Sequence, residues 1–409
     1  MKQNAVYITY AKRTPIGSFG SKGDLCSYRP DDLLSLVFLD FKKNCTFPLE
    51  TIDDTIVGCA NQAGEDNRNI ARMSLILADF PFSVPGTTIN RLCGSSLDAI
   101  LDGYCRIRSG MNECILVGGV ESMSRAPYVL SKANMGFDRD QKLYDTALGW
   151  RFENQKMANK FPLLSMGQTA QKVADELHIS REDQDVFAYQ SHQKAIKSLD
   201  TKAFEKEILP ISMEQNKATK VVTVITNDQG IRRDCTLEKL GSLKGAFKEN
   251  GSVTAGNSST LNDGASCVFL ASENFCKTHG LEPLVEILGG ATSGIHPNIM
   301  GLGPIEAIKK LEKNYHIQRN QFEFIELNEA FAAQALGCIR GLDLNPDLIN
   351  TKGGAIALGH ALGNSGTRIV TTLIHRMIEN KNYLKNPRLG LASMCIGVGQ
   401  GIALAVSSV

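Results

Sequence analysis

The sequence repeats one local plan twice, and this repeat restricts the fold more than any other feature. A turn of small residues around position 93 precedes a helical pattern over 95–109 and a strand over 113–118, which ends in Gly-Gly-Val-Glu. A similar turn around position 360 precedes a helical pattern over 365–379 and a strand over 389–394, which ends in Cys-Ile-Gly-Val-Gly. Two equivalent halves would bring their loops to one face, beyond the carboxyl ends of the strands, where ligands bind in open α/β sheets. Chance similarity between two α/β segments is the alternative.

The remaining pattern also favours an α/β fold. Short β-branched runs predict buried strands, and amphipathic runs predict helices; the strands are 5–10, 114–118, 267–271 and 401–406, and the helices are 31–40 and 304–312. Their alternation predicts a mostly parallel sheet. Between the halves, residues 122–251 are richer in charge, Gln and Asn, with a helix predicted over 180–192 and a strand over 221–226. We interpret this segment as an inserted domain that covers the active site.

Composition argues against several classes of protein. The chain has 409 residues, which suggests two or three domains, and its 44 basic and 43 acidic residues give no reason to expect nucleic acid or an anionic membrane as partner. The eleven cysteines and seven histidines lack metal-ligand spacing, so we expect no metal and a reducing compartment. No apolar run is long enough to span a membrane, and neither terminus carries a secretory or peroxisomal signal, so we expect the cytoplasm.

Three reactive side chains lie in small-residue turns far apart in the chain. Cys93, His360 and Cys395 lie within 90–96, 353–366 and 394–401. A thiol attacks as the thiolate, and a nearby His or a helix N-terminus lowers its pKa, so we expect a lowered pKa for Cys93. Two thiols and one imidazole predict covalent acyl chemistry, in which one thiol attacks and the other moves a proton. The alternative for each residue is structural: a buried Cys at a tight turn, a satisfied polar His and a strand-end Cys.

Further polar groups are candidates for the same site. Asn328 follows a strand-like run over 322–325 and either caps a helix or holds a water that donates to a thioester oxygen. The backbone amide of Gly397 is a candidate for an oxyanion pocket. The polar, glycine-bearing segment 254–264 offers donors for an amide-rich cofactor, although it lacks the pattern of a Walker loop.

With these motifs in view, the chain resembles the thiolases from about residue 5 to residue 406. Four motifs occur in the family's order: Asn-Arg-Leu-Cys-Gly-Ser, Asn-Glu-Ala-Phe-Ala, Gly-Gly-Ala-Ile-Ala-Leu-Gly-His and Cys-Ile-Gly-x-Gly-Gln-Gly. The resemblance implies a five-layer α-β-α-β-α fold of two similar halves. These are residues 1–121 with 252–280, and residues 281–409. The loop domain over 122–251 is inserted in the first half, covers the active site and binds CoA.

The resemblance also implies a ping-pong mechanism. Cys93, activated by His360, attacks the 3-keto carbon of a 3-oxoacyl-CoA, Cys395 protonates the departing acetyl-CoA enolate, and a second CoA resolves the acyl enzyme. His360 with a water on Asn328 would form one oxyanion hole, and the amides of Cys93 and Gly397 the other. CoA is then a co-substrate rather than a permanently bound cofactor, and a homodimer or homotetramer is implied. The residues matched to the CoA groove are Arg232, Leu243, Ala246, Phe247 and Ser259, with Met166 near the acyl end.

Three positions depart from the usual thiolase pattern. Ala361 replaces a common Pro, Ser165 stands where acetoacetyl-CoA thiolases often carry His, and Val398 replaces a frequent Gly. The last two, with segments 121–128 and 147–151, look more like the 3-oxoadipyl-CoA thiolases. A dicarboxylate substrate would need a cation for its distal carboxylate, for which Arg151 is a candidate; a surface charge is the alternative.

Other functions remain as alternatives. An acetoacetyl-CoA thiolase is the closest of these. A ketoacyl synthase shares the fold but uses one Cys with two His, and a papain-like hydrolase leaves the second Cys unexplained. A degenerate, thiolase-like lipid-binding protein would be expected to lose a catalytic group, yet Cys93, Asn328, His360 and Cys395 are all present. The sequence leaves open the acyl-chain length, the physiological direction and the choice between dimer and tetramer.

Overall fold

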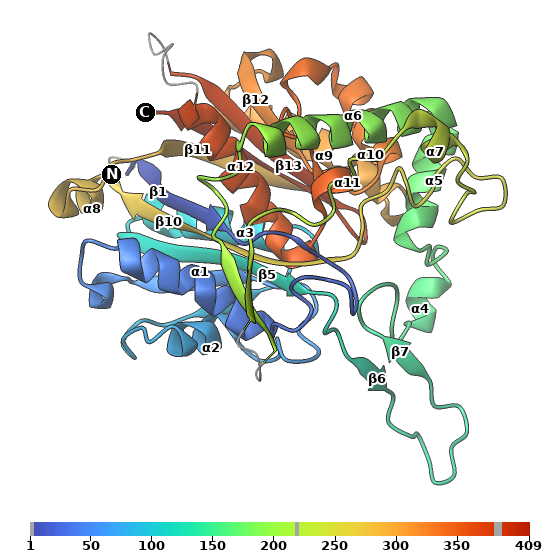
Figure 1. Cartoon of the computed structure of the whole chain (residues 1–409), viewed down its shortest axis with the longest axis horizontal. Helices are drawn as coiled ribbons and strands as arrows, with labels where there is room; N and C mark the ends of the chain where they lie inside the picture. Colours follow the sequence, from blue (N-terminus) through green and yellow to red (C-terminus); the bar gives the residue numbers. More distant parts are fainter. Residues whose placement is uncertain (1–3, 217–220, 380–386) are drawn as a thin grey trace.

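The computed structural model describes residues 4–216, 221–379 and 387–409 (Figure 1). Most of the strands in this part of the chain join one sheet in the order β12-β13-β14-β11-β1-β10-β5-β3-β4, with the short β2 paired to β10. In chain order the bounds of these strands are β1 Val6–Arg13, β2 Gly17–Ser18, β3 Asp54–Gly58, β4 Thr87–Ile89, β5 Cys114–Ser122, β10 Asn262–Ser272, β11 Val285–Gly294, β12 Phe322–Leu327, β13 Leu389–Ile396 and β14 Gln400–Ser408. Strands β1 to β5 and β10 form one side of this sheet, and strands β11 to β14 form the other. The two sides are joined by a short pairing of β1 with β11.

Helices divide the molecule into five layers, α-β-α-β-α. The central layer is α3 (Ser95–Arg108) with α12 (Ser365–Glu379), which contact each other and strands of both sheet ends. The outer layers are α1 (Pro30–Asn44) with α2 (Ile70–Leu77), and α9 (Gly303–Tyr315) with α10 (Ala332–Leu342) (Figure 1). Three apolar clusters fill the spaces between layers. The predicted five-layer fold is therefore confirmed.

Strand β5 shows how the sequence produces these layers. Successive side chains of a strand point to opposite faces of the sheet. Ile115 and Val117 accordingly pack into the central cluster, whereas Cys114 and Leu116 pack toward α1 and α2. Because both faces are covered, the strand is buried along its whole length, and residues 114–120 form a continuous apolar run rather than an alternating one.

The sheet is mixed, so the expectation of a mostly parallel sheet is wrong. Only the pairs β12·β13, β3·β4 and β3·β5 are parallel among the described strands of this sheet, and the other pairs are antiparallel. The reason lies in two connections. The glycine turn over 397–399 returns the chain directly from β13 into β14, and β10 enters beside β1 after the long segment that follows β5.

The turn–helix–strand repeat is present in both halves. Helix α12 has the predicted bounds, and α3 ends one residue earlier than predicted. The N-termini of these two helices touch, since the Thr367 backbone N–H donates to Ser96 Oγ at 2.9 Å. The approach requires glycine: a Cβ on Gly366 would lie 2.2 Å from the Leu97 nitrogen. The loops that precede the two helices therefore lie together.

The segment between β5 and β10 forms smaller units. These are the hairpin β6 (Tyr128–Leu130) with β7 (Leu143–Asp145), helices α4 (Gln155–Ala158), α5 (Met166–Glu176), α6 (Arg181–Asp200) and α7 (Leu237–Gly241), and the hairpin β8 (Ile211–Asn216) with β9 (Val221–Ile225). The β6–β7 hairpin projects from the body of the molecule (Figure 1). Helices α5 and α6 pack on α10, and α6 also contacts α11 (Ala355–Leu358), next to the loop that carries His360. The remaining helix, α8 (Glu273–His279), follows β10. Within the described ranges, no helix combines the length and apolar character needed to cross a bilayer.

Candidate active site

A pocket of about 240 Å³ opens beside the turn that carries Cys93. Its lining comes from both halves of the sheet and from the segment between them. Apolar side chains dominate, including Leu92, Met123, Leu148, Met166, Leu362 and Val398. The polar exceptions include Asn61, Glu121, Thr146, Ser165 and Arg151. An apolar cavity with a few polar groups is the usual form of a small-molecule site.

Cys93 lies in a tightly closed turn between β4 and α3. The Leu92 backbone has φ +48°, and Asn90 Oδ1 accepts a hydrogen bond from its N–H at 2.8 Å. Ser95 Oγ accepts from the Arg91 N–H at 2.9 Å, which closes the turn on the helix side. The turn also packs on the end of β13, where a Cβ on Gly94 would lie 2.5 Å from Ile396 Cδ1. These contacts hold Cys93 at the wall of the pocket.

The predicted lowering of the Cys93 pKa is wrong for the free protein. Burial raises the pKa of this thiol to about 11, and the charge of Glu121 acts in the same direction. A hydrogen bond from the Gly397 backbone N–H lowers it, but not by enough to offset the burial. Cys93 is therefore a protonated thiol at neutral pH.

Cys395 and Gly397 come from the end of β13. Cys395 is buried among apolar side chains that include Met166, Phe247 and Phe331. Burial raises the pKa of Cys395 well above its ordinary value, and the neighbouring Cys93 raises it further. The two sulfurs therefore lie close enough to interact, and Gly397, two residues beyond Cys395, lines the pocket and donates to Cys93.

His360 is held by its backbone and by one ring nitrogen. Its N–H donates to Asn262 Oδ1 at 2.8 Å, and Gly359 before it has φ +110°. The ring Nδ1 lies 2.6 Å from Ser365 Oγ and 3.5 Å from Asn328 Nδ2. Burial, and then the charge of Arg368, lower the pKa of His360 to about 4, so the ring is neutral at pH 7. Both contacts use Nδ1, which leaves Nε2 for chemistry.

Asn328 follows the end of β12 and is anchored through its backbone, which donates to Ser393 O on β13 at 2.9 Å. Its side chain is buried, and Oδ1 has no hydrogen-bond partner among the described residues. A buried amide oxygen without a partner is costly and is usually satisfied by water. The arrangement favours the water-holding interpretation of Asn328, and it is not an N-cap, because the N-cap of α10 is Phe331.

Met166 is the one predicted CoA-contacting residue that lines the Cys93 pocket. It lies at the start of α5, whose N-cap is Ser165 in a capping box with Gln168. Phe247 packs in the same cluster as Met166 and Cys395, with its ring 6.2 Å from that of Phe331.

The other predicted CoA residues lie outside the pocket. Leu243 and Ala246 are exposed on the segment after α7, and Ser259 donates from both N and Oγ to Ala330 O. Arg232 is exposed, and its N–H donates to His192 Nδ1 at 3.3 Å.

The pocket also contains residues to which the sequence analysis gave no role. The carboxylate of Glu121 lines it, as do Asn61 and Trp150, the only tryptophan of the chain. Trp150 Nε1–H donates to Leu164 O at 3.0 Å. Arg151 lines the same cavity, so it is not merely a surface charge. No motif distinguishes Asn61 in the sequence; only the fold brings it beside Arg151.

Comparisons with known proteins identify the family of this chain. The family model described as "Thiolase, N-terminal domain" matches residues 6–274, and "Thiolase, C-terminal domain" matches residues 281–408. The chain belongs to the thiolase family. The protein is therefore an acyltransferase. It cleaves a 3-oxoacyl-CoA reversibly, through a cysteine acyl-enzyme, with CoA as co-substrate and without a permanently bound cofactor.

Several relatives cover nearly the whole chain. The chain is 47% identical over 400 residues to the 3-oxoadipyl-CoA/3-oxo-5,6-dehydrosuberyl-CoA thiolase of Escherichia coli, covering 97% of this chain and 98% of that one. It is 48% identical to a beta-ketoadipyl-CoA thiolase of Acinetobacter baylyi, covering 98% and 99%. Among solved structures, the Bacillus anthracis acetyl-CoA acetyltransferase matches with a TM-score of 0.91 at 36% identity, covering 100% and 99%. Human mitochondrial 3-ketoacyl-CoA thiolase in complex with CoA matches with a TM-score of 0.89 at 36% identity, covering 99% and 98%.

Proposed function

We propose that this thiolase acts on a 3-oxoacyl-CoA whose acyl chain ends in a carboxylate, and that 3-oxoadipyl-CoA is its substrate. The observation that carries the proposal is the presence of Arg151 in the pocket that contains Cys93. The names of the bacterial relatives, which are 3-oxoadipyl-CoA and beta-ketoadipyl-CoA thiolases, point in the same direction.

The contacts of Arg151 suit recognition of an anion. Its guanidinium donates to Thr146 O at 3.0 Å and to Asn61 Oδ1 at 3.0 Å, both of which are neutral acceptors. It forms no ion pair with any residue in the described ranges. A partly buried guanidinium held by neutral groups keeps its attraction for a carboxylate, and its planar donors match carboxylate geometry. The mostly apolar lining of the pocket would hold the methylene chain between the two ends of the substrate.

We propose the following roles in the first half-reaction. The Cys93 thiol gives its proton to the unprotonated nitrogen of His360 as its sulfur attacks the 3-keto carbon. Proton transfer accompanies attack because the pKa values of both groups oppose ionisation in the free protein. The C2–C3 bond then breaks, its electron pair forms the enolate of acetyl-CoA, and the thiol proton of Cys395 passes to that carbon. The acyl group stays on Cys93 as a thioester.

The second half-reaction reverses the proton transfers. A new CoA thiol gives its proton to the Cys395 thiolate, or to His360 if the imidazolium has first passed its proton to Cys395, and attacks the thioester carbon. The shortened acyl-CoA is released, and the imidazolium of His360 returns a proton to the Cys93 sulfur. His360 and a water on Asn328 would hold one oxyanion, and the N–H groups of Cys93 and Gly397 the other. The unpartnered Oδ1 of Asn328 and the hydrogen bond from Gly397 to Cys93 support these assignments.

Ser365 allows His360 to serve both as base and as donor. When Nδ1 carries the proton and donates to Ser365 Oγ, Nε2 can accept the thiol proton. When Ser365 donates to Nδ1, Nε2 carries a proton and can stabilise an oxyanion. The rotating hydroxyl at 2.6 Å is compatible with either tautomer.

We further propose that CoA lies along the segment of residues 122–251, which is inserted in the first half, between residues 1–121 and 252–280; the second half is residues 281–409. The candidate contacts remain Arg232, Leu243, Ala246, Phe247, Ser259 and Met166. Leu243 packs over Gly256, where a Cβ would lie 2.5 Å from Leu243 Cδ1, so two predicted CoA-binding segments adjoin.

We also propose a homodimer or homotetramer in the cytoplasm. The free cysteines of the described residues fit a reducing compartment, and the exposed Met135 and Phe137 of the β6–β7 hairpin fit a contact between copies.

The experiment that tests the proposed substrate compares kcat/KM for 3-oxoadipyl-CoA, acetoacetyl-CoA and a longer, uncharged 3-oxoacyl-CoA. We expect 3-oxoadipyl-CoA to be preferred. Equal or better turnover of the two uncharged substrates would reject the distal-carboxylate proposal and favour an acetoacetyl-CoA thiolase.

The catalytic roles are tested separately: Cys93→Ala should abolish the acyl enzyme, whereas Cys395→Ala should keep some acyl transfer and lose exchange of the α-proton. Unchanged exchange in both variants would reject the roles.

A further inference from the structure

Glu121 is a buried carboxylate that the mechanism above does not use. It lies near the end of β5, is 1% exposed, and borders the Cys93 pocket. No ion pair within the described residues includes it, so its hydrogen-bond partners are backbone amides rather than a cation. A buried carboxylate without a cation is costly, which calls for an explanation beyond packing.

The hydrogen bonds of Glu121 join three segments of the chain. Oε2 accepts from the Gly363 N–H at 2.8 Å and from the Ala60 N–H at 3.0 Å, and Oε1 accepts from the Asn61 N–H at 3.1 Å. Gly363 belongs to the loop of His360, three residues further along. Asn61 provides the side-chain oxygen that Arg151 contacts. One carboxylate thus links the loop of His360 to Asn61, which contacts the guanidinium proposed to bind the distal carboxylate of the substrate.

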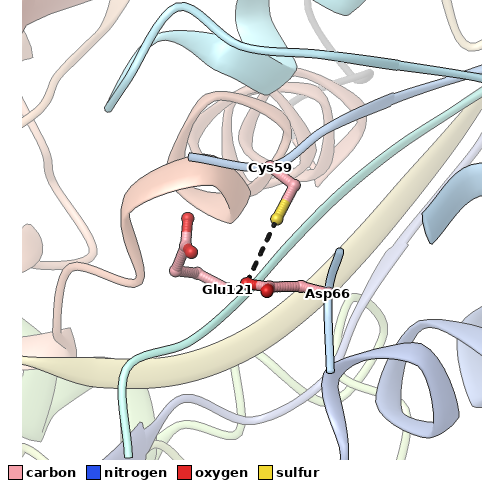
Figure 2. A group of neighbouring side chains, drawn as sticks. All are labelled: Cys59, Asp66 and Glu121. Carbon is pink, nitrogen blue, oxygen red and sulfur yellow. Dashed lines mark hydrogen bonds between the residues drawn. The ribbon is translucent and has the colours of Figure 1, made fainter. Parts of the chain in front are cut away.

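Close packing makes the contact between Glu121 and the His360 loop specific to Glu121 and Gly363. A Cβ on Gly363 would lie 2.8 Å from both Glu121 Oε2 and Cys59 Cα, so the loop approaches the carboxylate as only glycine can. The thiol of Cys59 donates to Asp66 Oδ2 at 3.8 Å beside Glu121 (Figure 2). The Cys59 sulfur and one carboxylate oxygen each of Asp66 and Glu121 lie within 4.8 Å of one another. Because both Glu121 oxygens already accept N–H groups, we do not assign a metal to this cluster.

We propose that Glu121 is a positioning residue, whose charged carboxylate holds the His360 loop and the Asn61–Arg151 pair in register across the pocket. The charged form accepts all three N–H groups. The neutral form carries a proton on one oxygen, so at least one N–H group faces a donor instead of an acceptor. Loss of the negative charge should therefore let the His360 loop, the Asn61 segment or both move away from their working positions.

The surroundings of Glu121 place this change within reach of ordinary pH. Burial raises its pKa to about 7, the neighbouring Asp66 adds to the rise, and the three N–H groups oppose it. The thiols of Cys59 and Cys93 also interact with its charge, and both have pKa values above the ordinary range. The guanidinium of Arg151 belongs to the lining of the same pocket. A raised carboxyl pKa means that the positioning form is present above pH 7 and is lost as pH falls through that value.

The test is a pH profile of kcat for the wild type, Glu121→Gln and Asp66→Asn, measured with acetoacetyl-CoA and with 3-oxoadipyl-CoA. Gln is a stable mimic of the neutral carboxyl, so at pH 8 we expect its kcat to be about 10- to 100-fold below that of the wild type. Between pH 8 and pH 6 the wild type should fall toward the Glu121→Gln value, which itself stays nearly constant. Asp66→Asn keeps the three hydrogen bonds and removes a neighbouring charge, so its acid limb should shift to lower pH with an unchanged kcat at pH 8.

Each outcome separates positioning from a merely structural role. A folded Glu121→Gln with the wild-type kcat and pH profile overturns the proposal, even if its Tm is lowered. If Glu121→Gln does not fold, Asp66→Asn decides: an acid limb at the wild-type pH overturns the proposal, and a lowered one supports it.

The effect of Glu121 that acts through Arg151 rests on the proposed substrate. The effect of Glu121 that acts through the His360 loop requires only that the protein is an active thiolase. A wild type that does not prefer 3-oxoadipyl-CoA rejects the proposed substrate alone, because the kcat effect is still measured with acetoacetyl-CoA. With both proposals correct, Glu121→Gln should also raise KM more for 3-oxoadipyl-CoA than for acetoacetyl-CoA.

Discussion

The imidazole Nδ1 of His360 lies 2.6 Å from Oγ of Ser365, the first residue of α12. The helix that follows the catalytic loop therefore supplies the group that orients the ring. The same helix meets α3 of the other half at its N-terminus, through the hydrogen bond from Thr367 to Ser96. The position of the imidazole is thus linked to the turn of Cys93 through the first residues of α12 and α3, because Cys93 lies three residues before Ser96.

Ser365→Ala should lower kcat because the ring loses the partner that fixes its orientation and pairs with Nδ1 in either tautomer. We expect a decrease of roughly tenfold or more, since small misplacements of catalytic groups are costly. Steady-state thiolysis of acetoacetyl-CoA measures it. Thr371→Ala removes another buried hydroxyl of the same helix, one that bonds only within α12, and should leave kcat nearly unchanged. Equal kcat values for the two variants would contradict the role of Ser365.

Alkylation of Cys93 in the free protein should be slow at neutral pH and should keep accelerating in alkali. Its pKa is raised to about 11 by burial, so below that pH the thiolate fraction rises about tenfold per pH unit. The measurement is the rate of inactivation by iodoacetamide between pH 7 and pH 10, with modification at Cys93 followed by mass spectrometry. A plateau near pH 8 would show a thiolate that is already stabilised before substrate binds.

Arg151→Met should damage recognition of the distal carboxylate specifically. Hydrogen bonds to charged groups contribute about 1.5–3 kcal/mol, so kcat/KM for 3-oxoadipyl-CoA should fall about 10- to 100-fold. Acetoacetyl-CoA lacks the second carboxylate and is the control within the same variant, with a change of no more than a few-fold. Parallel losses for both substrates would mean that Arg151 only supports the loop over 146–151.

Val398→Gly should stabilise the protein. Val398 lies in the left-handed region at φ +62°, where a β-branched residue is strained by about 1–2 kcal/mol relative to glycine. Part of that gain is offset by the greater entropy of glycine in the unfolded chain, about 0.5–1 kcal/mol, so the net increase in the free energy of unfolding is at most about 1.5 kcal/mol. Thermal unfolding measures it, and Val398→Ala, which keeps the Cβ, should not raise Tm by the same amount. An unchanged or lower Tm for Val398→Gly would contradict the strain argument.

Much of the fold could be predicted because local pattern and burial agree. The runs that became β5, β14 and α12 are buried on both faces or nearly so, and their apolar character is visible without tertiary information. Strand direction could not be predicted in this way. An apolar run such as β10 looks the same whether it pairs parallel or antiparallel, and its partners β1 and β5 lie more than a hundred residues before it.

The site was partly predictable for a related reason. Cys93, His360 and Cys395 are reactive residues in glycine-rich turns, so sequence reasoning finds them. The pKa of Cys93 was predicted in the wrong direction because burial, which depends on the folded surroundings, outweighs the N–H groups near the thiol.

Ala361 stands where thiolases commonly have Pro, a residue whose fixed φ would restrict the His360 loop. In the structure this loop is held instead by hydrogen bonds to Asn262, Glu121 and Ser365. Of these partners only Ser365 is close to the loop in sequence. Glu121 was visible in the sequence only as part of a motif, because its partners are backbone N–H groups that carry no sequence signature.

Trp150 gives the pocket a built-in optical reporter. Since the chain has no second tryptophan, its emission comes from one place, the cavity wall next to Arg151. An acyl group that settles on Cys93 would enter the surroundings of this indole, whereas the long CoA moiety leaves with the first product. Stopped-flow fluorescence could thus follow acylation and deacylation as separate phases in the unlabelled protein.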